Sequence, residues 1–443
     1  MSKNTLFTQV PSAATHSSLD LFQKPSVLVN FDQGTVQETY PLTGLDGPTL
    51  EFELRTDRNS FLDMTEIYLK LVVTVTDVQQ FTPVDEESRM QLVNNALHSM
   101  FQNCDVSLNG EHVSTSNSLY AHKAFITTEW SHTQGCKSSI LQCQGYKYEN
   151  NPGKLKENFD NAYYSQHNQW NDNPANDPHF QSTYFFFGKL AVDLFSCEKL
   201  LVPKCLLRIK LIKNTTDFFL KWCGDPKIDK DDAGNPVKPP QPGTFGVKFT
   251  KASLLSRQML VAENVYSSIE RALMKSPARY SYTETEAKTF IVPSGQNSFV
   301  KENIFNNRPI RSLAIAMNTN ESFNGKLMTS PFHYRDFGLQ RLILYRNGNA
   351  IYNISMKEGG HVQLYHNTLK SLHFYHDGPN VPLEQYKNHF VMVSDLTSTQ
   401  QSNDQVYYPE LIGGALRLEM VFEQALKSQL KFYSLENSWL HYT

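Results

Sequence analysis

One turn motif occurs twice in the chain, and it divides the sequence into two similar halves. The stretches FQNCDVSLNGEHV (Phe101 to Val113) and GLQRLILYRNGNAIY (Gly338 to Tyr352) each read as a strand, an Asn-Gly turn and a second strand. Asn-Gly between alternating hydrophobic residues is a strong short-range signal for a hairpin. The two turns begin at Asn109 and Asn347, 238 positions apart.

The segments around these turns also repeat in the same order. A β-branched strand precedes each turn, LKLVVTVTD in the first half and IRSLAIAMNTN in the second. After the turns, AVDLF around Asp193 matches VSDLT around Asp395. LLRIKLI around Arg208 then matches ALRLEMV around Arg417. We interpret this order as an internal duplication.

The two halves differ by an insertion. The turn and the following matched Asp are 84 residues apart in the first half and 48 in the second, so the first half carries 36 more residues. These fall at about 131–181, a segment rich in Asn, Gln, Asp, Tyr and Pro and poor in Val, Ile and Leu. Such a composition does not offset the entropy of ordering with a core of its own, so we predict a long surface loop.

Strand signals dominate both halves, and helical periods are few and short. Many short strands with turn residues between them are typical of an all-β sandwich. Each half is long enough for an eight-stranded jelly roll. The sequence therefore predicts an all-β fold of two tandem jelly rolls, a double jelly roll, with short helices and long surface loops. Strands are expected in these segments: 65–77, 182–195, 205–212, 245–261, and the later runs KTFIVPS, RSLAIAMN, LQRLILYRNG, NHFVMVSDL, ALRLEMVF and QLKFYSL.

The domain organisation follows from the same signals. Residues 1–25 are predicted to be a flexible arm, 26–262 the first jelly roll with the insertion at about 131–181, and 278–443 the second. Residues 263–277 are predicted to be a linker helix, because ENVYSSIERALMKS ends at a proline. Further short helices are expected after the two hairpins, at 118–130 and 362–374.

Composition limits the classes of function. The net charge is −3, from 41 basic and 44 acidic residues, which argues against strong direct binding to nucleic acid. There is no run of 18 apolar residues, so we expect no membrane span, and the first residues lack the apolar stretch of a signal peptide. Six scattered cysteines without C-x-x-C spacing indicate neither a disulfide framework nor a zinc site.

No motif for catalysis or cofactor binding is present, so we predict no catalytic, cofactor-binding or metal-binding residues and no enzyme activity. Four histidines close in sequence are interpreted as ordinary residues of a helix and its flanks: His361, His366, His373 and His376. The loop that contains Asp229, Asp231 and Gly234 begins like a calcium loop, but Pro240 stands where a bidentate Glu is needed. It is interpreted as a solvated acidic loop.

Two other features have structural interpretations. The sequons at Asn214, Asn320 and Asn353 are predicted to be unmodified, because no signal peptide is present. The aromatic run Tyr184–Phe187 is predicted to be a strand buried between its sheet and a neighbouring subunit, since an exposed patch of this size favours aggregation.

The segments quoted above, in their order from about Val27 to the C-terminus, resemble the double jelly-roll major capsid proteins of Polinton/Maverick-type elements and adintoviruses, in the adenovirus hexon lineage. Further segments that carry the resemblance are VNFDQGTVQETYPL, NNALHSMFQNCDVSLNGEHVSTSNSLYAHKAFITT and NIFNNRPIRSLAIAMNTNESFNGKLMTSPFHYRDFGLQRLILYRNGNAI. The resemblance implies a homotrimer with a pseudo-hexagonal outline that tiles an icosahedral shell.

It also implies contacts with neighbouring capsomers and with penton or minor capsid proteins. The chain would then belong to a virion capsid assembled inside the host cell, in nucleus or cytoplasm, without secretion through a signal peptide. The insertion at about 131–181 is a candidate for an outward tower or a trimer clasp, and the arm for an inner-face contact. The alternative function is that of a carbohydrate-binding, lectin-like β-sandwich protein, and a β-sandwich hydrolase ranks third.

Overall fold

The structure of the chain is a computed structural model. It describes residues 30–57, 59–78, 89–114, 117–155, 183–224, 238–241, 243–372, 381–399, 411–427 and 429–442. Several predictions lie outside these residues: the arm at 1–25, the acidic loop with Asp229, Asp231 and Gly234, the histidines His373 and His376, and residues 156–181 of the insertion.

The first half forms two four-stranded antiparallel sheets, which together we call roll 1. Their strand orders are β1-β10-β3-β7 and β2-β8-β5-β6, and β4 and β9 form a separate pair. The strands are β1 (Phe31–Thr39), β2 (Thr49–Leu54), β3 (Ser60–Asp77), β4 (Met90–Leu92), β5 (Phe101–Leu108), β6 (Glu111–His112), β7 (Thr183–Lys189), β8 (Leu207–Lys213), β9 (Leu220–Trp222) and β10 (Phe245–Val261).

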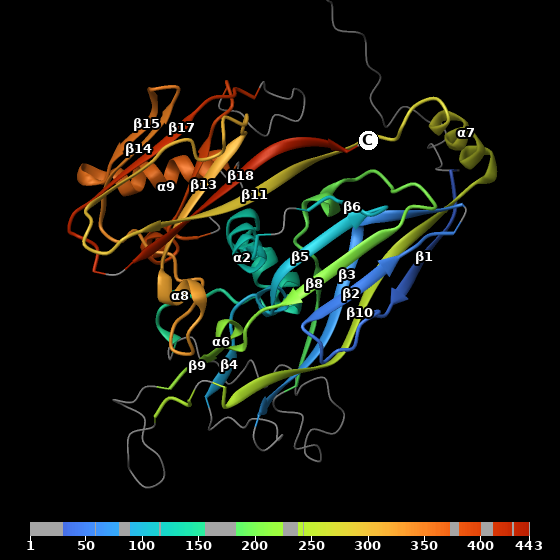
Figure 1. Cartoon of the computed structure of the whole chain (residues 1–443), viewed down its shortest axis with the longest axis horizontal. Helices are drawn as coiled ribbons and strands as arrows, with labels where there is room; N and C mark the ends of the chain where they lie inside the picture. The colour runs from blue at the N-terminus through green and yellow to red at the C-terminus, as the bar shows by residue number, and fades with distance from the viewer. Residues whose placement is uncertain are drawn as a thin grey trace, which may run out of the picture.

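The second half, roll 2, repeats this topology. Its sheets have the orders β11-β18-β13-β16 and β12-β17-β14-β15. The strands are β11 (Tyr280–Val292), β12 (Ser298–Lys301), β13 (Ser312–Thr319), β14 (Leu339–Arg346), β15 (Asn349–Ser355), β16 (Val391–Asp395), β17 (Leu416–Phe422) and β18 (Leu430–Tyr442). When the eight main strands of each roll are numbered along the chain, both rolls read 1-8-3-6 and 2-7-4-5. The predicted pair of eight-stranded jelly rolls is therefore confirmed, and Figure 1 shows them side by side.

The duplicated turns agree in detail. Asn109 and Asn347 both have φ of 51°, and the glycines that follow them have φ of 92° and 83°. Positive φ at both central residues is the type I′ geometry that matches the twist of a hairpin. The Asn109 Oδ1 accepts a hydrogen bond from the backbone N–H of Leu206 at 2.8 Å, and the Asn347 Oδ1 accepts one from Ala415 at 3.0 Å. Each donor immediately precedes the seventh strand of its roll, so each side chain ties its turn to the start of that strand.

The helices are few and mostly short. The longer ones are α2 (Tyr120–Ser131), α7 (Glu263–Leu273) and α9 (Gly360–Ser371), and α7 connects the two rolls. The shorter ones are α1 (Ala96–Ser99), α3 (Gln134–Lys137), α6 (Thr216–Phe219) and α8 (Asn320–Asn324), with 3₁₀ turns η3 (Ile140–Gln144), η5 (Asp193–Ser196), η6 (Lys357–Gly359) and η7 (Leu383–Asn388).

The strand predicted at 182–195 was too long. β7 ends at Lys189, and Asp193 begins η5, whereas the matched Asp395 is the last residue of β16. The chain leaves the sheet early because the backbone N–H of Ala191 donates to the Tyr120 hydroxyl on α2 at 3.2 Å, instead of to a neighbouring strand. Asp395 therefore ends the sixth strand of roll 2, whereas Asp193 lies four residues beyond the sixth strand of roll 1.

The prediction of a surface loop was wrong for the described part of the insertion, residues 131–155. This part contains α3 and η3, and it buries Leu141, Tyr146 and Leu155. It also buries Lys137 and Glu149, which are 1% and 5% exposed. Composition alone was misleading because these charges are compensated by partners from other parts of the chain, which are described below.

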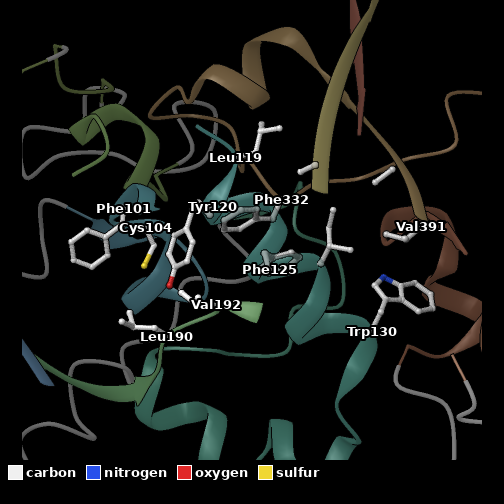
Figure 2. Packing of buried hydrophobic residues seen from close by; sticks show 14 of the residues in the cluster. Phe101, Cys104, Leu119, Tyr120, Phe125, Trp130, Leu190, Val192, Phe332 and Val391 are labelled. Atoms are coloured by element: carbon white, nitrogen blue, oxygen red, sulfur yellow. The ribbon is translucent and has the colours of Figure 1, made fainter. Parts of the chain in front are cut away.

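The apolar core is continuous through both rolls. One cluster of buried residues includes Phe101 and Tyr120 from roll 1 and Phe332 and Val391 from roll 2. Figure 2 shows residues of this cluster close to α2, which Figure 1 places between the two sets of sheets. The rolls therefore share one core.

Candidate functional site

The described residues contain no group of three or more His, Cys, Asp or Glu side chains that could hold a metal ion. His361 on α9 instead pairs with Asp336, with 3.0 Å between Nε2 and Oδ2, and His366 is exposed on the same helix. All six cysteines are free. None of the helices in the described ranges is long and apolar enough to span a membrane.

The most elaborate site is instead the contact between the two rolls, which we call the junction. Its apolar part is built on α2. The ring of Phe125 stacks on Phe332 of roll 2 at 4.2 Å between centroids, with 4° between the ring planes. The buried His122 stacks on Phe323 at 4.9 Å, and its Nδ1 lies 3.1 Å from the hydroxyl of Tyr334. Aromatic pairs of this kind add to the free energy of simple area burial.

The centre of the junction is a buried carboxylate, Glu129 of α2, which is 2% exposed. Its Oε2 accepts a hydrogen bond from the hydroxyl of Tyr146, and its Oε1 lies 3.7 Å from Lys137 Nζ and 3.3 Å from Nδ1 of His389 in roll 2. Burial alone would raise the pKa of Glu129, but His389, Lys137 and Tyr146 together outweigh it and lower the pKa to about 2. Glu129 is therefore ionised throughout the physiological range.

A second buried ion pair adjoins the first. Lys221 of β9 donates to Glu149 at 3.0 Å, and both side chains are at most 5% exposed. Burial would lower the pKa of Lys221, but the adjacent Glu149 outweighs it and raises the pKa. The backbone carbonyl of Glu149 in turn lies 2.7 Å from Nε2 of His389. His389 thus contacts both ion pairs, which connects roll 2 to the insertion of roll 1.

The junction also covers an open sheet edge. β11 is the outer strand of its sheet, and roll 1 binds its free side at Thr285. Thr285 donates its N–H to Asp193 Oδ2 at 2.7 Å and accepts from Lys123 Nζ at 2.9 Å, while Lys123 and Asp193 pair with each other at 2.7 Å. The Asn117 amide donates to the backbone carbonyl of Ala287. Exposed edges favour association with other chains, so this contact protects roll 2.

The aromatic run Tyr184–Phe187 is buried on one of its two faces, and on that face the prediction of burial is met. Tyr184 and Phe186 point inward and are 1% and 3% exposed, while Phe185 and Phe187 are 51% and 40% exposed. The ring of Phe187 stacks on Tyr68 of β3 at 5.0 Å. An apolar hollow of about 540 Å³ lies between the end of β7, η3 and α2. A subunit on the exposed face remains a prediction.

The sequons occupy ordinary structural positions. Asn214 follows β8, Asn320 begins α8, and the exposed Asn353 lies in β15, where its Oδ1 accepts from Arg341 Nε at 3.1 Å.

Sequence reasoning missed the junction residues. Asp193 was noticed only because its motif is repeated, and Glu129, Lys137 and His389 gave no signal, since isolated charged residues in polar segments usually face solvent.

Solved structures of several viral proteins align with this chain over nearly its whole length. A chain in the cryo-EM structure of the Sputnik virophage aligns over 97% of this chain and 91% of its own length, with a TM-score of 0.62 and 12% identity. The Faustovirus major capsid protein aligns over 98% and 92%, with a TM-score of 0.61 and 9% identity. The chain has a double jelly-roll fold. The mavirus major capsid protein, which also has this fold, aligns over 98% and 93%, with a TM-score of 0.51 and 10% identity.

Sequence comparison gives one more relation. No family model matches the chain. A protein of Caenorhabditis elegans, the uncharacterized protein F54H12.2, is 20% identical over 302 residues, which are 66% of this chain. The match spans 64% of the length of the worm protein.

Proposed function

We propose that the chain is a major capsid protein, whose role is to assemble an icosahedral shell rather than to catalyse a reaction. The observation that carries this proposal is the repeated topology, because two eight-stranded rolls with the same strand order lie in one chain. Capsid proteins of several viruses share this double fold over nearly their whole length. Three such chains supply six similar modules, and a closed three-fold ring of them has a pseudo-hexagonal outline that tiles a shell.

The finer proposal is a capsid protein of the Polinton/Maverick–adintovirus type. The relative in a nematode supports it, because a related sequence in an animal is expected of an element that resides in animal genomes. The partners would then be two further copies in a homotrimer, neighbouring capsomers, and penton or minor capsid proteins. The chain would be found in the virion capsid, after assembly inside the host cell, without a membrane span and without strong direct binding to nucleic acid.

The junction supports a structural role. Buried ion pairs at Glu129 and Glu149 require fixed geometry, because a charge left unpaired in the core is strongly destabilising. The two rolls are therefore held at one relative orientation, which a regular shell needs in each of its subunits.

The test is the mass of the purified chain in solution, measured by light scattering. One chain is 50.7 kDa, so a trimer has about 152 kDa. A stable trimer whose preparations form closed shells in electron micrographs is the expected result. A chain that stays monomeric at high concentration contradicts the proposal, and glycan binding by that monomer would favour the lectin-like alternative.

A further inference from the structure

The two surfaces that form the junction each have an equivalent in the other roll, and these two equivalent surfaces do not contact each other within one chain. Roll 1 contacts roll 2 through the helix between its fifth and sixth strands, α2, and roll 2 receives this contact on its first strand, β11. Because both rolls have the same topology, roll 2 has an equivalent helix, α9, and roll 1 has an equivalent first strand, β1. Among the residues that the structure describes, no third roll packs on α9 or covers β1.

The two helices differ in burial as this symmetry requires. Both contain 12 residues, so each position of α2 corresponds to the position 240 residues later in α9. Nine residues of α2 are buried, and only three residues of α9 are buried. α2 is covered on both sides, by its own roll and by roll 2, whereas α9 is covered on one side only.

Some of the residues that contact roll 2 from α2 have exposed counterparts in α9, while those of Phe125 and Glu129, which are Tyr365 and Leu369, are partly buried. His122, which stacks on Phe323, corresponds to Val362, which is 53% exposed. Trp130, which meets Tyr386 edge-to-face at 6.0 Å, corresponds to the exposed Lys370. The exposed face of α9 is therefore the face that α2 uses to bind a neighbouring roll.

The first strands show the same difference. Only one of the 13 residues of β11 is exposed, whereas seven of the nine residues of β1 are exposed, including Val36 at 66%. β1 is the outer strand of its sheet, and no hydrogen bond from the described residues reaches its free backbone edge. An uncovered outer strand is a template for pairing with another chain.

The chemistry of the two vacant faces is complementary. A hollow of about 110 Å³ beside α9 is lined by Asn367, Lys370 and Asp395, the residue types that Asn117, Lys123 and Asp193 supply at the edge of β11. β1 carries two acidic residues and no basic ones, and one of the acidic residues, Glu38, already pairs with Lys70 at 3.7 Å. α9 carries the exposed Lys370 and two histidines and no acidic residue, and one of these histidines, His361, already pairs with Asp336. In Figure 1 β1 lies at the right of the molecule and α9 at the left, with α2 between them, so one copy presents both faces at once.

We propose that β1 of one copy docks on the α9 face of the next copy, and that this contact repeats between chains the α2–β11 contact within each chain. The interface is head-to-tail, and with the three-fold rotation of the proposed homotrimer it closes into a ring in which rolls 1 and 2 alternate. This inference rests on the proposed homotrimer and identifies the surfaces that join its subunits.

The test uses single substitutions of exposed residues, which leave the fold of each chain intact. V362E alters the α9 face and V36E alters β1, while V300E changes an exposed valine of β12 as a matched control, 46% exposed and on the other sheet of roll 2. In light scattering we expect about 152 kDa for the unaltered chain and for V300E, and 50.7 kDa for V36E and V362E. Circular dichroism verifies that all variants are folded.

Mixing the two variants tests the head-to-tail arrangement directly. V36E keeps an intact α9 face and V362E keeps an intact β1, so the mixture should form a dimer of about 101 kDa that does not close into a ring. A mixture that stays monomeric overturns the head-to-tail pairing. If the unaltered chain and both variants are trimers, this interface is wrong while the proposed function stands. If the unaltered chain is itself monomeric, the proposed function fails as well.

Discussion

Replacing Glu129 by glutamine tests whether the buried charges hold the junction together. The substitution keeps the shape of the side chain and removes its charge, so Lys137 is left as a buried cation whose side chain is fully shielded from solvent. Removing one partner of a buried ion pair costs about 3–5 kcal/mol, because the remaining charge is uncompensated.

The pKa of Glu129 gives a second estimate of the stability that E129Q loses. A pKa of about 2 in the folded chain, against 4.5 for an ordinary glutamate, corresponds to about 3 kcal/mol of stabilisation of the charged form. Because the folded pKa is the lower one, this stability is present above about pH 4.5 and is lost as the pH falls towards 2. Both routes predict that E129Q lowers the free energy of unfolding at pH 7 by about 3 kcal/mol.

The assay is urea unfolding followed by tryptophan fluorescence. Trp130 is 2% exposed and lies at the junction, edge-to-face with Tyr386 of roll 2, so its emission reports on separation of the rolls. The matched control is E321Q, which breaks a surface pair of 2.6 Å whose side chains are 56% and 65% exposed. Exposed pairs contribute about 1 kcal/mol or less.

The double variant E129Q/K137M removes both charges and should be more stable than E129Q alone, because no buried lysine is then left unpaired. If E129Q loses no more stability than E321Q, the buried charges do not hold the junction, and the reasoning is refuted.

Three further predictions use other parts of the structure. Burial lowers the pKa of His98 and of His333 to about 4, so between pH 6.5 and 4 the unfolded chain binds more protons than the folded chain. The free energy of unfolding should therefore fall with acidification by up to about 3 kcal/mol per pH unit, and equal values from urea unfolding at pH 7 and pH 5 would contradict this. Phe125→Ala removes the ring stacked on Phe332 and should cost about 3–5 kcal/mol in the same assay; a loss below 1 kcal/mol would mean that this stack is not part of the shared core. Trypsin should not cut the folded chain after Lys137, because this side chain is fully buried; early cleavage there, detected by mass spectrometry, would restore the surface-loop interpretation of residues 131–155.

The fold was predictable because its local sequence signals occur in both halves of the chain. Asn109 and Asn347 mark their hairpins by residue type alone, and β17 alternates buried and partly buried positions along its length. β1 was missed because FDQGTVQET is polar and exposed, and such a strand carries no hydrophobic period.

The junction was not predictable, since its residues meet only when distant segments dock. Glu129 and His389 are 260 positions apart, and Glu149 and Lys221 are 72 positions apart. Each one alone reads as a solvated polar residue. Only the pairing in space shows that the first part of the insertion fills the contact between the rolls.

The order of strands also determines when each strand can pair during translation. β1 pairs with β10, with Phe31 opposite Val261, so the first strand waits for a partner 230 positions later. At about 5–20 residues per second, the ribosome needs on the order of 10–50 s to supply that partner. Roll 1 can complete its sheet only then, when most of roll 2 has not yet been synthesised. In roll 2, β11 likewise pairs with the late strand β18, with Tyr280 opposite Tyr442. Each nascent chain therefore exposes unpaired strands for tens of seconds. During this time, neighbouring nascent chains on the same polysome can pair with these strands prematurely, and chaperone binding would be most important.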